Sequence, residues 1–279
     1  MQELIKALSA IDGIVAVGLG GSRGLGLADE NSDYDFVLFR NSGDRIGGQI
    51  IVDAIKPYAD AANIRTHSSF VMAQAMGKKI EIFQHDLSLI EREISTAREG
   101  KFRWSIRPLF PHGSISTGLI SHIIHLELCF EQGGCVSKLR RLAQPFPDSL
   151  MRSLINVFLR QAGITVTHAS KIKKAADLQY LIALCSGFVF YANVVIFSIN
   201  RQYPVIERGG AKLIFDLPLR PKNYERRITM LFQASSKGDV RLVIAELAAM
   251  LAELRTLANK ALEGSTAIDV QGVALKVAL

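Results

Sequence analysis

The sequence predicts an α/β (α+β) domain with a mixed sheet, followed by an all-α helical bundle. Two apolar runs near the N-terminus, residues 14–19 and 34–39, have the length and the Ile, Val and Phe content of buried strands. From Pro147 onward, apolar residues recur at spacings of three and four, the period of helices. A chain of 279 residues suits one large domain or two ordinary ones. We therefore expect one domain over residues 1–145 and another over residues 146–279.

The first predicted strand ends at a turn with the features of a phosphate site, Gly20-Gly21-Ser22. Glycines let the backbone approach a ligand closely, and Ser22 is suited to cap a short following helix. The exposed N–H groups at the start of such a helix attract anions. The turn therefore predicts a site for a phosphate group.

Two aspartates lie at the start of the second predicted strand. Successive side chains of a strand point to opposite faces, so Asp33 and Asp35 share one face, while Tyr34, Phe36 and Leu38 share the other. Two neighbouring carboxylates repel each other unless a cation lies between them. Mg²⁺ takes oxygen ligands and retains phosphate oxygens as partners. The pair therefore predicts a magnesium site beside the phosphate site.

Together these features form a pattern: Gly21-Ser22, ten intervening residues, then Asp33-Tyr34-Asp35-Phe36. This pattern resembles the signature of the polymerase-β-type nucleotidyltransferase superfamily. The resemblance implies Mg²⁺-dependent transfer of a nucleoside monophosphate from a triphosphate, with ATP expected, to an acceptor hydroxyl. It assigns the metal to Asp33 and Asp35 as catalytic residues, and the β- and γ-phosphates to Gly21 and Ser22. The alternative to a nucleotide site is a glycine-rich turn followed by a solvated Asn-Ser-Asp turn. Against it, Asp35 lies inside an apolar strand, where an unpaired carboxylate is disfavoured.

A third acid is expected from a later strand of the superfamily fold. Glu81 alternates with Ile80 and Ile82 in a predicted strand, where the resemblance places this metal ligand and catalytic residue. It could instead be a polar residue on a wet sheet face. Glu127 is an alternative ligand, an acceptor base, or simply a partly exposed strand residue. Arg23 is expected to contact the phosphates, although a salt bridge to an acid at position 29 or 30 is as plausible.

The period and the turn signals predict the remaining elements. A helix is expected over Asp44–Ala62, with Ile46, Ile50, Ile51, Ala54 and Ile55 on one side. Strands are expected over Ser68–Ala73 and Lys79–Phe83, and a helix is expected from a Ser88/Glu91 capping box to about Glu99. An irregular connection over residues 100–121 and a strand over His122–Phe130 complete this part of the chain. On that last strand, His122 and His125 would point to opposite faces and would not share a metal. The bundle helices are expected over Pro147–Gln161, His168–Asn200, Tyr224–Ser235 and Asp239–Leu262, with breaks at Gly163, at the loop from Gln202 to Pro221 and at Lys237-Gly238.

The second half is similar to the helical bundle of kanamycin and lincosamide nucleotidyltransferases. The resemblance rests on Ala176-Asp177, on Ser198-Ile199-Asn200-Arg201 and on Glu207-Arg208-Gly209. It implies that Asp177 and Arg208 join the nucleotide site, which we expect in a cleft between the domains. The chain departs from the family pattern, with Ala176 in place of Gly and Arg208 in place of Lys. Asp177 could equally be a helix-surface acid and Arg208 a loop cation.

Composition narrows the partners. A net charge of +7 favours polyanionic ligands, but the basic residues are scattered in small groups and form no stripe interleaved with aromatic residues. Three cysteines without a C-x-x-C spacing fit a reducing cytoplasm. The N-terminal residues lack a signal-peptide pattern, and polar residues interrupt the apolar stretch Leu178–Ile199, which we expect to be a buried bundle helix.

We expect a small hydroxylated acceptor, such as an antibiotic. Acids at Asp177, Glu127 and Glu131 are candidates for lining its pocket. An RNA or protein acceptor, or a nucleotide-binding module without catalysis, are the alternatives.

Overall fold

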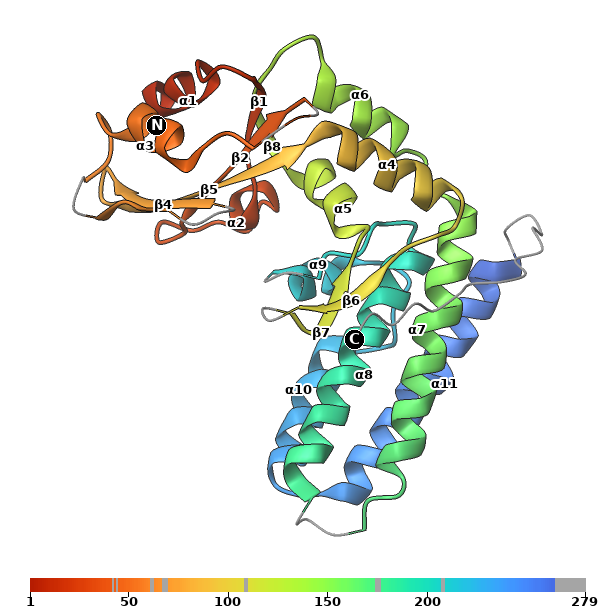
Figure 1. Ribbon diagram of the computed structural model, residues 1–279. Helices are drawn as coiled ribbons and strands as arrows, with labels where there is room; N and C mark the ends of the chain where they lie inside the picture. Colours follow the sequence, from red (N-terminus) through yellow and green to blue (C-terminus); the bar gives the residue numbers. More distant parts are fainter. Residues whose placement is uncertain are drawn as a thin grey trace. The chain divides into compact units, whose positions relative to one another are not determined.

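A computed structural model describes residues 1–41, 43, 45–60, 63–66, 70–107, 110–173, 177–206 and 209–263 (Figure 1). The chain divides into two compact units. Unit 1 comprises Met1–Ser95 and Leu119–Pro145, and unit 2 comprises Thr96–Gly118 and Phe146–Leu279. A contact unit need not fold independently, so the domains 1–145 and 146–279 stay a prediction.

Unit 1 contains a six-stranded sheet. In spatial order its strands are β3 (Arg65–Thr66), β4 (Phe70–Ala75), β5 (Lys78–Asp86), β2 (Tyr34–Arg40), β1 (Ile14–Leu19) and β8 (Glu127–Glu131). Strands β2 and β5 are parallel, and the other neighbouring pairs are antiparallel. The predicted mixed sheet is confirmed, and the two strands that carry the motif begin and end within one residue of their expected bounds.

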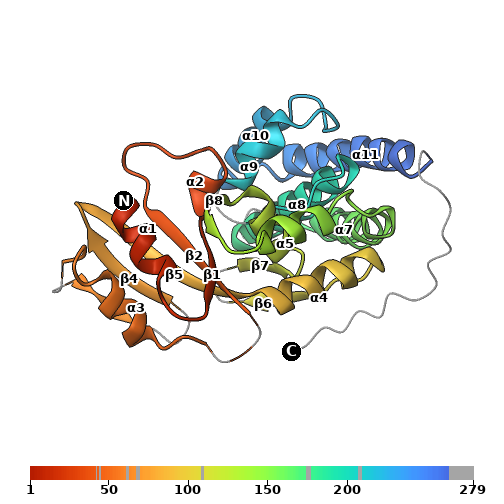
Figure 2. The same cartoon turned by 90° about the horizontal axis from the view of Figure 1, so that it is seen from above.

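Helices α1 (Gln2–Ser9) and α3 (Gly48–Ile55) cover one face of this sheet (Figure 2). Their buried side chains join alternate residues of the central strands in a single apolar cluster. The cluster includes Leu4, Leu8, Ile14, Val17, Leu19, Phe36, Leu38, Ile51, Ile55, Ile80 and Ile82. Because side chains alternate along a strand, residues 35 and 81 are directed to the opposite face of the sheet.

Helix α3 is shorter than the predicted helix over Asp44–Ala62. It begins at Gly48 and ends at Ile55, two residues before Pro57, because proline has no backbone N–H with which to continue the helical hydrogen bonds. Ile50 is 53% exposed, so its expected place on the buried side of the helix is wrong. The helix faces the sheet with Ile51 and Ile55, which lie four residues apart.

Helix α5 (Gly118–His125) replaces the first half of the strand predicted over His122–Phe130. Ile120 and Ile123 are both buried, and their spacing of three fits one face of a helix. Only the second half of the segment is the strand β8. Arg140 of α6 (Cys135–Leu142) secures the end of α5, because its Nε donates to the carbonyl of Ile123 at 2.7 Å and its Nη2 donates to the carbonyl of Leu126.

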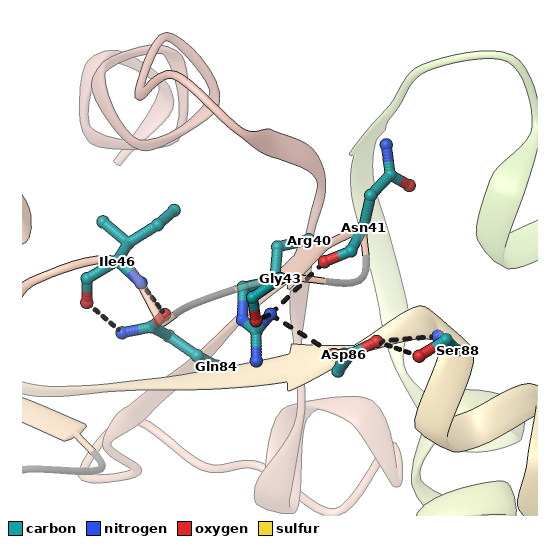
Figure 3. A network of polar contacts seen from close by, with 7 residues as sticks. All are labelled: Arg40, Asn41, Gly43, Ile46, Gln84, Asp86 and Ser88. Carbon is teal, nitrogen blue, oxygen red and sulfur yellow. Dashed lines mark hydrogen bonds and ion pairs between the residues drawn. The ribbon is translucent and has the colours of Figure 1, made fainter.

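A polar network joins the C-terminal ends of β2 and β5 (Figure 3). Arg40 Nη1 lies 3.3 Å from Asp86 Oδ2, and both side chains are largely buried. The other carboxylate oxygen of Asp86 accepts hydrogen bonds from the Ser88 amide at 2.8 Å and the Ser88 hydroxyl at 2.7 Å. Asp86 therefore caps α4 (Leu87–Arg98), and the predicted capping role of Ser88 is wrong. Burial alone would raise the pKa of Asp86, but these hydrogen bonds and the Arg40 charge outweigh it and lower the pKa.

The same network fixes the loop after β2. The side-chain amide of Gln84 donates to the carbonyl of Ile46 at 2.9 Å and accepts from its N–H at 3.1 Å (Figure 3). Arg40 also donates to the carbonyl of Gly43 at 2.5 Å. These bonds satisfy backbone groups of the loop, which is therefore held against the C-terminal end of β5.

Unit 2 is mainly helical. Its long helices are α7 (Asp148–Ala169), α8 (Leu178–Ile199), α10 (Tyr224–Ser236) and α11 (Val240–Glu263), and α8 packs against the other three. The predicted bundle is confirmed, with three corrections. The helix expected over His168–Asn200 begins at Leu178, and His168 belongs to the last turn of α7. Gly163 lies inside α7 and does not interrupt it, and the predicted loop from Gln202 to Pro221 contains the short helix α9 (Gly210–Asp216).

By length and composition alone, helix α8 is long and apolar enough to cross a membrane. Among the described residues it is the single helix with this property. Over its most apolar window, 56% of the residues are buried within the protein. A core helix of a globular bundle has the same properties, because its whole circumference faces other helices.

Residues 100–121 are not the irregular connection that was expected. They contain a hairpin of β6 (Trp104–Arg107) and β7 (Phe110–Ile115), followed by the start of α5. Trp104 anchors this hairpin, since its indole N–H donates to the carbonyl of His112 at 2.8 Å and its ring packs 5.0 Å from Phe158, centroid to centroid. The hairpin is therefore part of the aromatic core of unit 2.

Candidate active site

Strands β2 and β5 bring two of the predicted acids together. In their parallel register Asp35 pairs with Glu81, and side chains of directly paired residues project from the same face. Asp33 immediately precedes β2, two residues before Asp35. Its carboxylate contacts the side chain of Lys79 on β5, which Glu81 also contacts. Two of the three acids therefore lie on adjacent strands, which hold them more rigidly than loops would.

Lys79 links the acids of this face. Its ammonium lies 2.5 Å from Glu81 Oε1 and 3.3 Å from Asp33 Oδ2. The side chain of Lys79 is 50% exposed and that of Glu81 is 22% exposed. The hydrogen bond to Glu81, together with both negative charges, outweighs partial burial and raises the pKa of Lys79. A cationic group therefore already lies between two of the predicted metal ligands.

The glycine turn packs directly against Asp35. The N–H of Gly20 donates to the carbonyl of Asp35 at 2.8 Å. Gly21 adopts a φ of +55°, and a Cβ at this residue would lie 1.8 Å from Asp35 Oδ2. A residue with a side chain cannot occupy this position unless Asp35 moves. The turn and the acidic pair are therefore a single structural feature.

Ser22 lies inside the short helix α2 (Gly21–Gly24) and does not cap it, because the N-cap is Gly20. The predicted capping by Ser22 is wrong. The residue nevertheless directly follows the glycine packed on Asp35, in the first turn after β1. The Ser22 hydroxyl would therefore be available to a phosphate bound by the turn.

Arg23 contacts the segment that carries Asp33. Its Nε donates to the carbonyl of Asp33 at 3.1 Å, and its Nη2 donates to the carbonyl of Ser32 at 2.9 Å. The guanidinium also lies 3.6 Å above the centre of the Tyr34 ring. The partners of Arg23 are therefore backbone carbonyls and the Tyr34 ring. The sequence had suggested a phosphate or an acidic side chain as its partner. These contacts fix the entry of the chain into β2 and hence the position of Asp33.

The comparison with known families covers this part of the chain. Residues 1–82 match a nucleotidyltransferase domain. The match includes the glycine turn, both aspartates and Glu81, and it supports transfer of a nucleoside monophosphate as the general chemistry. Such a domain implies a nucleoside triphosphate substrate and usually a divalent metal ion.

Two further comparisons add little to this assignment. The crystal structure of a nucleotidyltransferase-like protein from Exiguobacterium sibiricum 255-15 is similar at 10% sequence identity and a TM-score of 0.33, over 94% of this chain and 78% of that one. No curated protein matches the chain. The resemblance of the helical half to kanamycin and lincosamide nucleotidyltransferases stays a prediction.

His122 lies beside the glycine turn, a position that the sequence did not indicate. On α5 its Nε2 would lie 2.4 Å from a Cβ at Gly20, so the imidazole borders the glycine turn. Its Nδ1 lies 3.2 Å from His85 Nε2 of β5. Burial, and then the neighbouring His122, lower the pKa of His85 to about 3, so His85 is neutral at ordinary pH. The spacing of three between Ile120 and Ile123 fits a helix, but this local pattern did not exclude the predicted strand.

Glu127 lies at a different place on the sheet. It pairs with Leu19 in the register of β1 and β8, and Leu19 belongs to the apolar cluster on the face covered by α1 and α3. Since paired residues share a face, the register directs Glu127 away from the face of Asp35 and Glu81. Glu131, at the end of β8, accepts hydrogen bonds from the amides of Val136 and Ser137, both at 3.1 Å, and so caps α6.

The two residues carried over from the resemblance of the helical half belong to unit 2. Asp177 is exposed and occupies the N-cap position of α8, but it makes no capping hydrogen bond with its side chain to any described residue. Arg208 lies outside the described residues. The assignment of both residues to a nucleotide site stays a prediction.

The acids fit a magnesium ion by donor type, since carboxylate oxygens are hard ligands. Among the described residues, however, no three His, Cys, Asp or Glu side chains gather closely enough to form a ready metal site. Asp33 and Glu81 converge on the ammonium of Lys79 instead. A metal ion at this position would therefore take over contacts that a lysine makes in this structure.

Proposed function

We propose that this chain transfers a nucleoside monophosphate from a magnesium-bound nucleoside triphosphate, ATP in the first instance, to a hydroxyl group of a small acceptor. Pyrophosphate would be released. The observation that carries the proposal is the pairing of Asp35 with Glu81 on adjacent parallel strands, directly beside a glycine turn packed on Asp35. The match of residues 1–82 to a nucleotidyltransferase domain supports it independently.

In this proposal Asp33, Asp35 and Glu81 hold the metal. When bound, Mg²⁺ supplies a Lewis acid that offsets charge on the attacked phosphate and lowers the pKa of the acceptor hydroxyl. Gly21 allows the triphosphate to approach the backbone, and Ser22 offers a hydroxyl to it. The protein's own contribution is position, because the strand pair fixes two acids and the turn fixes the phosphates relative to them.

Arg23 and His122 have supporting roles in this proposal. Arg23 fixes the chain that carries Asp33, as its bonds to the carbonyls of residues 32 and 33 indicate. A contact between Arg23 and a phosphate stays part of the proposal. His122 packs against Gly20, and its contact with His85 orients its ring.

A small acceptor is favoured because many basic side chains have intramolecular partners. Arg140 binds carbonyls at the end of α5, Arg40 binds Asp86, and Arg227 binds Glu246 and Glu253. A nucleic-acid acceptor needs a continuous track of basic side chains that are available to several phosphates. A hydroxylated, antibiotic-like molecule needs only a compact site. An RNA or a protein acceptor remains the alternative.

Asp177 and Arg208 are included in the proposal as nucleotide contacts from the helical half. The proposed location is the cytoplasm, where the three cysteines, which are free in this structure, would stay reduced. The oligomeric state does not enter the proposal.

One incubation tests the proposed reaction. The protein is mixed with Mg²⁺ and ATP labelled at the α-phosphate, together with aminoglycosides, lincosamides, short RNAs or proteins. A parallel series contains ATP labelled at the γ-phosphate. We expect the α-label to move to a small acceptor and the γ-label to appear in pyrophosphate.

The matched control is Asp35→Asn, which should transfer no label. Label on an RNA end or on a protein would establish the macromolecular alternative. ATP binding without transfer to any acceptor class would favour a binding module. Transfer of the γ-label to an acceptor would refute the proposed chemistry.

A further inference from the structure

Lys79 occupies a position that the proposed function assigns to a metal ion. Its ammonium contacts Asp33 Oδ2 at 3.3 Å and Glu81 Oε1 at 2.5 Å, so one cationic nitrogen bridges carboxylates that are far apart in the sequence. Mg²⁺ binds carboxylate oxygens at about 2.0–2.1 Å. The lysine therefore satisfies the same oxygens more loosely than a metal would.

The arrangement follows from strand geometry. Lys79 and Glu81 are two residues apart on β5, so their side chains emerge on the same face, and the register sets this face beside Asp35. Lys78 emerges on the other side of the strand, and its ammonium donates to the backbone carbonyl of Glu30. Of two adjacent lysines, only one is directed to the acids.

A counter-ion is needed on this face. Two ionised carboxylates a few Å apart repel each other, so that without a nearby cation one of them would bind a proton or the pair would separate. The ammonium of Lys79 removes this repulsion through its contacts with both side chains. It is also half-exposed, and exposed ion pairs are weak, so a stronger ligand of the carboxylates can replace it.

We propose that Lys79 is a built-in counter-ion of the acidic site, which holds Asp33 and Glu81 together in the absence of a metal and which a divalent cation must displace. This inference rests on the proposed function, because it concerns the same three acids. It means that the free protein binds a divalent cation only weakly. A triphosphate that arrives with its metal offers the displaced ammonium a new anionic partner, since the four-carbon stem of lysine is flexible.

The experiment measures binding of Mn²⁺ alone to the full chain, by the electron paramagnetic resonance signal of the free ion. Mn²⁺ prefers the same oxygen ligands as Mg²⁺. The variants are Lys79→Met, which removes the ammonium, and the matched control Lys78→Met, which removes the same charge one residue away. Asp35→Asn tests the metal site itself. Circular dichroism confirms that each variant is folded.

We expect Lys79→Met to bind Mn²⁺ about tenfold more tightly than the wild type, because a unit charge next to a divalent ion is removed. Lys78→Met should change the affinity less than about twofold, since exposed charges at a distance are screened. Asp35→Asn should lose this binding. An equal gain in both lysine variants, or no gain in Lys79→Met, would overturn the inference.

The same data separate the two levels of the proposal. If Asp35→Asn loses Mn²⁺ binding while Lys79→Met behaves as the wild type does, the metal site stands and the role of Lys79 is wrong. If Lys79→Met binds no Mn²⁺ at all, the counter-ion role fails, and the acids are not the metal site that the proposed function requires.

Discussion

Substitution of Gly21 by alanine tests the contact between the glycine turn and Asp35. Gly21 has a φ of +55°, where a side chain is strained by roughly 1–2 kcal/mol. In addition, the new Cβ would lie 1.8 Å from Asp35 Oδ2 and 2.8 Å from its Cγ. Asp35 must then leave its rotamer, at a further cost of about 0.5–1.5 kcal/mol.

Gly26 provides the matched control for this substitution. It has a φ of +69°, but no heavy atom lies within 4 Å of a Cβ placed there. Gly26→Ala therefore carries the backbone strain without the clash. We expect Gly21→Ala to lower the free energy of unfolding by about 2–3 kcal/mol and Gly26→Ala by about 1–2 kcal/mol.

The assay is guanidinium unfolding followed by far-UV circular dichroism and by hydrogen exchange of residues in β1 and β2. Fluorescence is unsuitable, because the single tryptophan, Trp104, lies in unit 2. Only Gly21→Ala should also weaken binding of magnesium-ATP, since only this change displaces Asp35. Equal stability of the two variants, with equal nucleotide binding, would refute the packing of Gly21 on Asp35.

Three further predictions concern other residues of unit 1. Glu81→Gln should lower turnover by orders of magnitude with little loss of stability, and Glu127→Gln should do less; the reverse order of kcat would exchange their roles. Arg23→Lys should weaken binding of the metal more than binding of metal-free ATP, because it releases the chain that carries Asp33. An equal loss of both would show a phosphate contact instead. Asp86→Asn should lower the free energy of unfolding by about 1 kcal/mol at neutral pH, because asparagine can still cap α4 but lacks the charge that pairs with Arg40. Since the pKa of Asp86 is lowered from its ordinary 3.8, its contribution is present above that value and disappears as pH falls through the folded-state pKa. A difference between wild type and variant that persists in strong acid would contradict this assignment.

The motif and the strands that carry it could be predicted from the sequence because local signals agree there. Glycines bound the run over residues 14–19, half of which is β-branched, and the run over residues 34–39 is rich in aromatic residues. The placement of Glu81 beside Asp35 followed from a resemblance, and the register of β2 and β5 now gives it a geometric basis. The helical bundle of the second half was likewise predictable from the spacing of its apolar residues.

Other features depend on contacts that no local pattern encodes. The segment that contains His122 is rich in Ile, Leu and His, which suits a strand as well as a helix, and only packing over the sheet selects a helix. The approach of His122 to Gly20 joins residues about a hundred positions apart. The bridge from Lys79 to Asp33 was equally hidden, because a lysine in a strand usually indicates a wet face.

The most direct test of the central claim is the melting temperature of the wild type and of Asp35→Asn with ATP, in Mg²⁺ and in a chelator. A ligand at about 100 times its Kd stabilises the folded state by about 2.7 kcal/mol, which raises the melting temperature by several degrees. We predict a rise that depends on Mg²⁺ in the wild type, and loss of its Mg²⁺-dependent part in Asp35→Asn without unfolding of the variant. Absence of any Mg²⁺-dependent shift in the wild type with all four common triphosphates would contradict the assignment of this face as a nucleotidyltransferase site.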